Sequence, residues 1–260
     1  MKEKIYQMLI ELTNGKNSSM LLKKMTTSPI SKKFIRSYSK VYDINIDEVS
    51  RNLNSFTSLH DFFTRTLKDE ARPVIQHAHV LASPVDAKIE AFGNISIDTE
   101  IIVKNKPYSL VDLLGSKERA QQYQNGQFIV FYLSPADYHR IHSPIDGEVV
   151  RQYILGQKSY PVNQLGLTYG KKPISLNYRM INEVLYASQR QLALIKVGAT
   201  FVNSIELTNR TRNWKKGEEV GYFSFGSTVV MLFEENAVEF TENVVQGCAI
   251  RMGEAFANML

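Results

Sequence analysis

Short apolar runs of strand length fill this chain from about residue 71 onward, and they constrain its fold more than any other feature. Gly and Pro residues separate the runs, and none approaches the ~18 consecutive apolar residues of a membrane-spanning helix. Such runs predict β-strands, while a few stretches between them have helical spacing. We expect strands at residues 88–97, 127–133, 148–155, 192–207, 219–225, 228–234 and 244–252, and helices at residues 109–114, 116–123 and 178–184.

The first 70 or so residues have a different pattern, which is typical of short helices. Ser58 stands where an N-cap is expected before a helix at residues 59–63. Apolar residues recur at spacings of three and four, namely Ile5, Met8, Leu9 and Leu12, and again Ile30, Phe34, Ile35 and Tyr38. We therefore predict a helical, basic N-terminal region at residues 1–70 and a β-rich domain at residues 71–260. The expected fold class is α+β, mostly β, with an antiparallel β-sandwich-like domain.

The formal net charge of +5 is unevenly placed, because residues 1–40 carry nine Lys and Arg against two acidic residues. A basic, amphipathic segment suits an anionic surface. No nucleic-acid-binding motif is present, so we expect a membrane surface and no nucleic acid. The single cysteine, Cys248, excludes a disulfide scaffold and a cysteine-ligated zinc site and favours a reducing, cytosolic compartment. We expect no signal peptide, because the N-terminus has no apolar segment followed by a cleavage site.

The triplet Gly226-Ser227-Thr228 lies between two apolar, strand-like stretches and is a candidate for chemistry. Glycine leaves its carbonyl open to attack, and a base close to Ser227 could drive the serine hydroxyl onto that carbonyl. The resulting N→O acyl shift would break the chain and make residue 227 a new N-terminus. The same triplet is also ordinary turn chemistry, so its weight depends on the rest of the chain.

Three upstream residues could supply the base and its support. Asp86 precedes a predicted strand, and His139 and His142 lie within four residues of each other. A histidine is most effective as a base when a carboxylate fixes its tautomer and steadies its charged form. On these residues alone, either histidine could be the base.

Together these segments resemble the phosphatidylserine decarboxylases of the bacterial, pyruvoyl-dependent type. The resemblance covers residues ~60–235 in the family's order. It departs from the family at Phe225, where leucine is usual, and at Ala87, where glycine commonly follows the aspartate. The segments that carry it are Phe62-Phe63-Thr64-Arg65 with Arg72-Pro73, Ser83-Pro84-Val85-Asp86, Tyr138-His139-Arg140-Ile141-His142-Ser143-Pro144, Val197-Gly198-Ala199, Lys216-Gly217-Glu218-Glu219-Val220-Gly221-Tyr222-Phe223 and Phe225-Gly226-Ser227-Thr228.

The resemblance implies a self-cleavage triad in which Asp86 orients His142 and His142 takes the hydroxyl proton of Ser227. Cleavage between Gly226 and Ser227 would give a β chain, 1–226, and an α chain, 227–260, and would convert Ser227 into a covalent pyruvoyl group. This cofactor would form a Schiff base with phosphatidylserine and accept the electrons left by CO2, which gives phosphatidylethanolamine. His139 is implied at the substrate, and His139 and His142 are the candidates for the proton donor to the substrate carbon. Residues 71–260 would then be the catalytic domain of a lyase of phospholipid biosynthesis.

The lipid substrate agrees with the basic N-terminal region. Phosphatidylserine is anionic and stays in the bilayer, so the resemblance implies a peripheral protein on the cytoplasmic side of the cell membrane. The expected partners are therefore the lipid, the anionic membrane surface and the two chains of one precursor. A homodimer is an arrangement that the sequence leaves open.

Two other functions are compatible with parts of the chain. A zinc hydrolase could use His77 and His79 with Asp86 and His142 as further ligands, although residues 74–79 look like an exposed connection and we predict no metal site. A biotinyl- or lipoyl-carrier domain has similar turns at residues 143–149 and 215–220. The carrier lysine flanked by methionines is missing, so these turns indicate only a related sandwich geometry.

Overall fold

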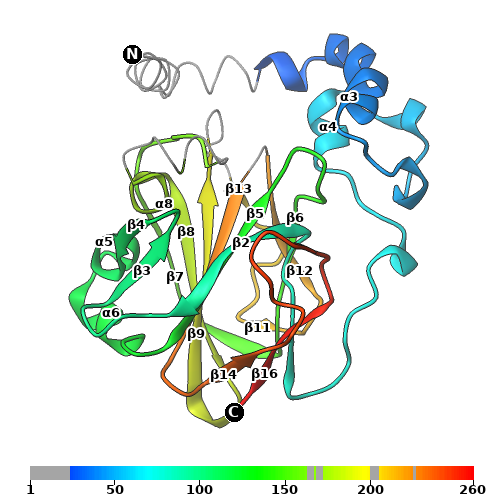
Figure 1. Cartoon of the computed structure of the whole chain (residues 1–260). Coiled ribbons are helices and arrows are strands. Elements are labelled where there is room, and N and C mark those ends of the chain that lie inside the picture. Colours follow the sequence, from blue (N-terminus) through cyan, green and yellow to red (C-terminus); the bar gives the residue numbers. More distant parts are fainter. Residues whose placement is uncertain (1–23, 163–166, 168–171, 200–204, 225–226) are drawn as a thin grey trace.

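A computed structural model describes residues 24–162, 167, 172–199, 205–224 and 227–260. The element order begins with short helices and continues with strands, as Figure 1 shows. Within the described residues, no helix combines the length and the apolar character that are needed to cross a bilayer.

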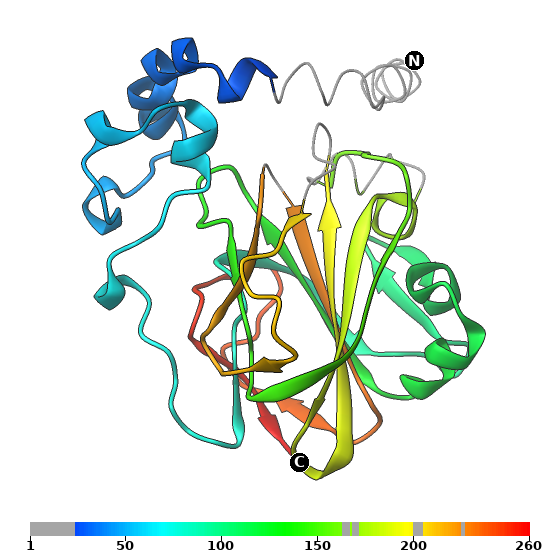
Figure 2. The ribbon, with the colours of Figure 1, turned by 180° about the vertical axis from the view of Figure 1, so that it is seen from behind.

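An eight-stranded antiparallel sheet forms the centre of the molecule, and β13 lies in its middle (Figures 1 and 2). All seven residues of β13 are buried, and β9 and β5 flank the strand along its whole length. In spatial order the strands are β11 (Asn213–Trp214), β7 (Gly147–Leu155), β8 (Arg179–Tyr186), β9 (Arg190–Gly198), β13 (Ser227–Phe233), β5 (Gln127–Leu133), β2 (Ala87–Asn94) and β15 (Ala249–Ile250).

One face of this sheet packs against two smaller antiparallel sheets. The first has the order β10 (Ile205–Glu206), β12 (Glu219–Phe223) and β6 (Arg140–His142), and the second has the order β1 (Val80–Ala82), β16 (Ala255–Met259) and β14 (Val238–Phe240). Val229, Met231 and Phe233 of β13 contribute to the apolar core between the layers. This layered arrangement confirms the predicted sandwich-like, mostly β fold.

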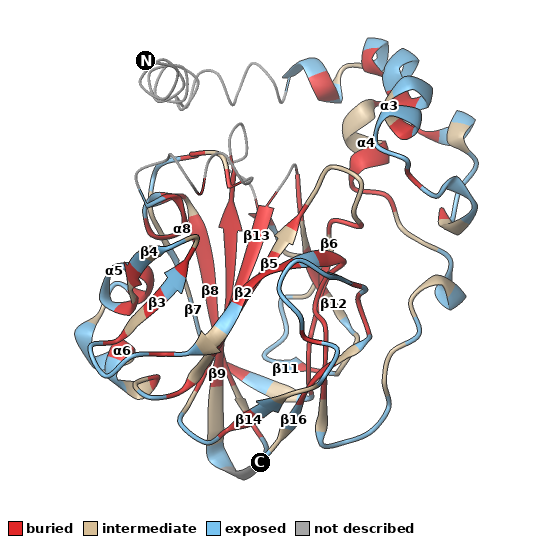
Figure 3. Ribbon diagram, in the orientation of Figure 1, coloured by how far each residue is buried: buried red, intermediate tan, exposed pale blue. Residues whose placement is uncertain are grey.

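The opposite face of the sheet is covered by a hairpin and helices. The hairpin consists of β3 (Glu100–Val103) and β4 (Lys106–Ser109), and the helices are α5 (Leu110–Leu114), α6 (Lys117–Gln122) and α8 (Pro173–Leu176). Val230 and Leu232 of β13 point into this second core, because successive side chains of a strand alternate between faces. Both faces of the central strands are therefore buried, as Figure 3 shows.

The described helices before β1 lie to one side of the sheet, at the end where β13 begins (Figures 1 and 2). Residues 24–27 are helical, and the helices that follow are η1 (Pro29–Phe34), α3 (Ile35–Val41), η2 (Ile46–Glu48), η3 (Leu53–Ser55), α4 (Leu59–Phe63) and η4 (Asp69–Ala71). Ile35, Phe56 and Phe62 belong to a small core of their own. The predicted N-cap is confirmed, because the Ser58 hydroxyl accepts a hydrogen bond from the amide of Asp61 at 3.1 Å.

Three expectations about secondary structure need correction. The predicted strand at 244–252 is largely wrong, because only β15 (Ala249–Ile250) is a strand within it. The predicted helix at residues 178–184 is wrong, because this segment is part of β8 and pairs with both β7 and β9. A short apolar run does not distinguish a buried strand from a helix, and pairing on both sides decides the outcome here. The predicted strand at 192–207 is divided, since β9 ends at Gly198 and β10 starts at Ile205, and η5 (Ala187–Gln189) turns the chain between β8 and β9. The helices predicted at 109–114 and 116–123 are confirmed by α5 and α6.

Candidate active site

Ser227 is the first residue of β13, in the middle of the central sheet. It pairs with Leu133 of β5 on one side and with Gly198 of β9 on the other. Its side chain is fully buried, and its Oγ has no hydrogen-bond partner among the described residues. Burial of an unpaired hydroxyl costs stability, and such groups in a native fold call for an explanation in chemistry or strain. Gly226, the residue on the other side of the predicted cleavage point, lies outside the described residues.

His142 ends β6 and has a hydrogen-bond partner on each ring nitrogen. Nδ1 lies 2.9 Å from the carbonyl oxygen of Gly217, and Nε2 lies 3.2 Å from the Tyr138 hydroxyl. A carbonyl can only accept, so Nδ1 carries the hydrogen and Nε2 accepts from the tyrosine. Burial lowers the pKa of His142 below its ordinary value of 6.5, which keeps the ring neutral at pH 7. The basic nitrogen of His142 is therefore Nε2.

The turn that carries Gly217 requires a glycine. Its φ is +78°, and a Cβ at this position would lie 2.7 Å from a methyl group of Val74. The Gly217 amide donates to the Ser143 carbonyl at 2.8 Å, which fixes the turn beside β6. Only glycine combines this backbone conformation with so close a neighbour, and the result is a carbonyl aimed at His142.

His139 lies just before β6 and has one free nitrogen. Nδ1 lies 2.8 Å from the carbonyl oxygen of Asp137 and so carries the hydrogen, while Nε2 is buried without a hydrogen-bond partner in the described part of the chain. The Phe63 ring packs against the imidazole with centroids 4.0 Å apart. Burial, with a smaller contribution from the Arg65 cation, lowers the pKa of His139 to about 3. His139 is thus neutral, with a lone pair on Nε2 that no described residue occupies.

Arg65 holds the backbone segment before His139. Its guanidinium Nη2 donates to the carbonyl oxygens of Ala136 and Asp137 at 2.7 and 3.1 Å. Arg65 follows α4, so this contact joins the N-terminal helices to the loop that carries His139. Because the Asp137 carbonyl also accepts from His139, the arginine positions the acceptor that fixes the tautomer of that ring.

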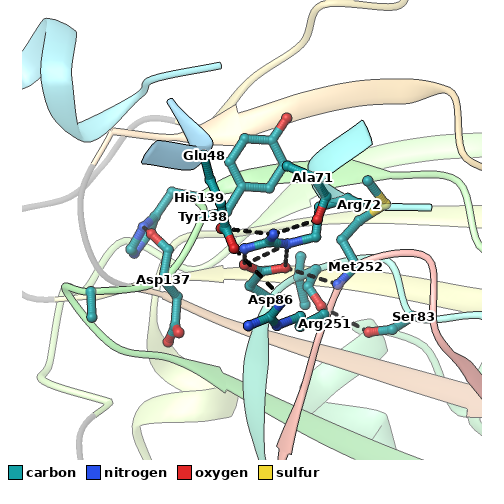
Figure 4. A network of polar contacts seen from close by, with 12 residues as sticks. Glu48, Ala71, Arg72, Ser83, Asp86, Asp137, Tyr138, His139, Arg251 and Met252 are labelled. Carbon is teal, nitrogen blue, oxygen red and sulfur yellow. Dashed lines mark hydrogen bonds and ion pairs between the residues drawn. The ribbon is translucent and has the colours of Figure 1, made fainter. Parts of the chain in front are cut away.

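Asp86 lies between β1 and β2, and its carboxylate is held by Arg72 (Figure 4). Arg72 Nε lies 2.8 and 3.0 Å from the two oxygens, and Nη2 lies 2.5 Å from Oδ2. The amide of Met252 donates to Oδ1 at 2.8 Å. Arg72 also binds Glu48 at 2.9 Å, so an acidic residue of the N-terminal helices completes the network. Ala87 begins β2 in an extended conformation, so the usual glycine is not required there.

The structure therefore groups the predicted residues differently from a hydrogen-bonded triad. Asp86 contacts Arg72, and the atom that orients His142 is the Gly217 carbonyl. Neither Asp86 nor Ser227 forms a hydrogen bond with His142 among the described residues, although the negative charge of Asp86 acts to raise the His142 pKa. The roles of Asp86, His139, His142 and Ser227 remain predictions.

Sequence reasoning missed the contacts of Tyr138, Gly217 and Arg72. All three belong to the segments that resemble the family. Tyr138 stands directly before His139, Gly217 lies in the turn before β12, and Arg72 precedes Pro73. The contacts of Arg72 and Gly217 link residues 14 and 75 positions apart, so only their place in these segments could have indicated them, whereas Tyr138 and His142 stand four positions apart.

The two histidines of the alternative zinc site lie in the exposed segment before β1. His77 and His79 are exposed, with their rings 6.2 Å apart. Both nitrogens of His142 and both oxygens of Asp86 already have protein partners. Within the described ranges, no cluster of three or more His, Cys, Asp or Glu side chains could hold a metal ion.

Comparisons with known proteins give a consistent family assignment. The sequence model of phosphatidylserine decarboxylase matches residues 59–258. A phosphatidylserine decarboxylase proenzyme of Geobacillus sp. (strain WCH70) is 51% identical over 250 residues, which cover 96% of each chain. Proteins with the same description from Anoxybacillus flavithermus (strain DSM 21510 / WK1) and Bacillus thuringiensis (strain Al Hakam) are 52% and 46% identical over 250 and 260 residues, covering 96% and 100% of this chain and 94% and 99% of theirs. A match of this extent, together with the buried serine and the two neutral histidines, shows that the chain belongs to the phosphatidylserine decarboxylase family.

Proposed function

We propose that this chain is a self-processing proenzyme whose mature form decarboxylates phosphatidylserine to phosphatidylethanolamine and CO2. The observation that carries the proposal is the fully buried Oγ of Ser227 at the start of the central strand, which has no hydrogen-bond partner among the described residues. The relatives described above are named as proenzymes of this activity.

The surroundings of Ser227 fit its conversion into a pyruvoyl group. Attack of Oγ on the Gly226 carbonyl would move the acyl group from nitrogen to oxygen and free the amine of residue 227. Elimination of the ester would leave a dehydroalanine, and hydrolysis with loss of ammonia would leave the keto group. A buried hydroxyl without a competing hydrogen bond supports the first step. Once formed, the group would supply an electron sink for the electron pair left by CO2.

The two histidines suit different tasks. His142 is the proposed base for the Ser227 hydroxyl, with Nε2 as the nitrogen that takes the proton. His139 is neutral, and its Nε2 has no hydrogen-bond partner within the described ranges, so it could take a proton from the substrate ammonium and later return it to the carbon that has lost CO2. Asp86 would act on His142 through its charge, held in place by Arg72.

Strand pairing would hold the two proposed chains together after cleavage. The α chain, 227–260, would contain β13, β14, β15 and β16. β13 pairs with β5 and β9, β15 pairs with β2, and β16 pairs with β1, so each contact reaches the β chain, 1–226. Separation would therefore break the central sheet, and we expect the chains to remain associated without a covalent bond.

The N-terminal helices support a peripheral position on an anionic membrane surface, for which we propose the cytoplasmic face. Ile30 and Phe34 of η1 are 70% and 59% exposed, and Val41 of α3 is 75% exposed. The neighbouring cations form no ion pair within the part of the chain that the structure describes; they are Lys24, Lys32, Lys33, Arg36 and Lys40. Exposed apolar side chains among unpaired cations fit a surface of anionic lipid. These helices lie at the same end of the molecule as the start of β13, which would place the site near the lipid (Figures 1 and 2).

Intact mass under denaturing conditions tests the self-processing. The wild-type protein should give fragments 1–226 and 227–260, with the smaller one lighter by one ammonia than a fragment that begins with serine. Ser227→Ala should remain one full-length chain without decarboxylase activity on phosphatidylserine vesicles. Ser175→Ala is the matched control, because it removes a buried hydroxyl from α8. A full-length wild-type mass, or full activity of Ser227→Ala, would contradict the proposal.

A further inference from the structure

We propose that Tyr138 is a positioning residue of this site, whose hydroxyl fixes the orientation of the His142 ring by donating to Nε2, the nitrogen that would take the proton. This inference rests on the proposed self-processing and adds a residue to it. The supporting contact is the hydrogen bond from the Tyr138 hydroxyl to His142 Nε2 at 3.2 Å.

The two contacts of His142 have different consequences. The Gly217 carbonyl at Nδ1 decides which nitrogen carries the hydrogen. It still leaves the ring free to tilt about that single bond, and the second contact at Nε2 removes this freedom. The Tyr138 and His142 rings lie 5.7 Å apart with an angle of 35° between their planes, so the tyrosine reaches the imidazole edge through its hydroxyl. A hydroxyl can also turn and accept once Nε2 is protonated, so Tyr138 can remain a partner throughout the transfer.

The hydrogen bond of Tyr138 is not a general consequence of burial in this fold. Tyr108, Tyr123 and Tyr186 are also buried, and their hydroxyls have no hydrogen-bond partner in the described part of the chain. The fold therefore tolerates an unpaired tyrosine hydroxyl. Burial raises the pKa of Tyr138, so its hydroxyl keeps its proton and can donate to Nε2 near neutral pH.

The neighbouring backbone places this pair beside the chain that leads to Ser227. The amide of Phe223, at the end of β12, donates to the His139 carbonyl at 3.0 Å. Tyr138 and His142 flank His139 in sequence, and Phe223 stands four residues before Ser227. The charged groups that act on His142 are Glu219 on β12, Arg140 on β6 and Asp86 before β2, and none of them is altered when only the Tyr138 hydroxyl is removed.

Tyr138→Phe in the full-length proenzyme tests the role directly. Loss of one orienting hydrogen bond should slow self-cleavage about tenfold at neutral pH, since ~1.4 kcal/mol corresponds to a factor of ten. The hydroxyl contacts Nε2, the nitrogen that would take the proton, so its removal should also shift the His142 pKa and with it the acid limb of the cleavage profile. Tyr108→Phe, which removes a buried hydroxyl without a partner, should change neither quantity. An unchanged or faster cleavage of Tyr138→Phe with an unchanged pH profile would overturn the proposal.

A second measurement is independent of cleavage, and its first part uses the chain with Tyr138 in place. In the uncleaved Ser227→Ala chain, imidazole 15N NMR should show His142 with hydrogen on Nδ1 and a hydrogen-bonded acceptor at Nε2. Tyr138→Phe in the same background should shift the Nε2 resonance toward that of a free acceptor. A His142 ring with hydrogen on Nε2 in the native-Tyr138 chain would overturn the inference. This result would leave the proposed function standing, because that function is tested by the fragment masses.

Discussion

Arg72 binds both carboxylate oxygens of Asp86, with Nε at 2.8 and 3.0 Å and Nη2 at 2.5 Å, in a setting where both side chains are almost fully buried. The same guanidinium reaches Glu48 at 2.9 Å. The position of the Asp86 charge near His142 thus depends on an arginine from outside the sheet and on an acidic residue of the N-terminal helices.

Removal of Arg72 should therefore affect both stability and processing. Arg72→Gln leaves a buried carboxylate with the Met252 amide as its remaining partner, and we expect a loss of about 3 kcal/mol in the free energy of unfolding. Urea denaturation of the uncleaved Ser227→Ala background measures this value. Arg51→Gln is the control, because it breaks the ion pair between Arg51 and Asp61, in which the arginine side chain is 44% exposed. This substitution should lower the free energy of unfolding by less than about 1 kcal/mol. Equal losses of unfolding free energy in the two variants would show that the buried Arg72–Asp86 pair stabilises the fold no more than an exposed ion pair does.

Stability should depend on pH through His139. Its pKa in the folded chain is about 3, below the ordinary value of 6.5, so the unfolded chain binds more protons between these pH values. The free energy of unfolding should then fall as the pH is lowered from about 6.5 toward 3, by up to several kcal/mol from this residue. His139→Gln should flatten that part of the curve, as measured by urea denaturation at each pH. Parallel curves for the two proteins would be inconsistent with a neutral, buried His139.

The two histidines should separate by phenotype. His142→Ala should leave the chain uncleaved, because the proposed base for Ser227 is lost. His139→Ala should still cleave and fail to decarboxylate phosphatidylserine. General acid–base catalysis contributes about 100-fold or more, so each loss should exceed 100-fold. Intact mass reports cleavage, and CO2 release from labelled lipid reports the reaction. Normal cleavage of His142→Ala would assign the base to another residue.

Gly217→Ala should disturb His142 through the backbone. The new Cβ would lie 2.7 Å from Val74 at a φ of +78°, so the turn must shift and move the carbonyl away from Nδ1. We expect slower cleavage and a loss of more than about 1 kcal/mol in the free energy of unfolding. Gly247→Ala is the matched control, because its φ is +90° and the nearest atom lies 3.8 Å from the added Cβ. Thermal denaturation and cleavage rates of both variants separate backbone strain from the specific contact.

Membrane association should depend on the exposed face of η1 and on salt. Phe34→Ser should weaken binding to vesicles of anionic lipid, while Ile102→Ser, on β3, removes an apolar side chain of similar exposure and should not. Binding should also weaken as the salt concentration rises, because screening reduces the attraction between the lysines and the lipid charges. Co-sedimentation with vesicles measures both effects. Binding that is equal in both variants would place the docking surface elsewhere.

Many of the strands were predictable, because apolar runs and the turn residues that bound them can be recognised in a short stretch of sequence. Strands such as β5 and β7 have the expected bounds within a residue, because their runs are bounded by Gly and Pro or by polar turns. β8 was not predicted as a strand, because Met180, Ile181 and Val184 fit the spacing of a helix as well as that of a strand buried on both faces. The pairing of β8 with two neighbours supplies hydrogen bonds that no local pattern reveals.

The sequence by itself determined the family and the residue types of the site, because Ser227, His139, His142 and Asp86 stand in recognisable short segments. Only the tertiary structure decided which atoms these residues contact. Arg72 takes the Asp86 carboxylate, and the carbonyl of Gly217 takes the Nδ1 hydrogen of His142, across separations of 14 and 75 residues. The physical reason is that hydrogen bonds act over a few ångströms. Their partners are therefore chosen by how strands and turns pack, whereas a motif records only which side chains are available.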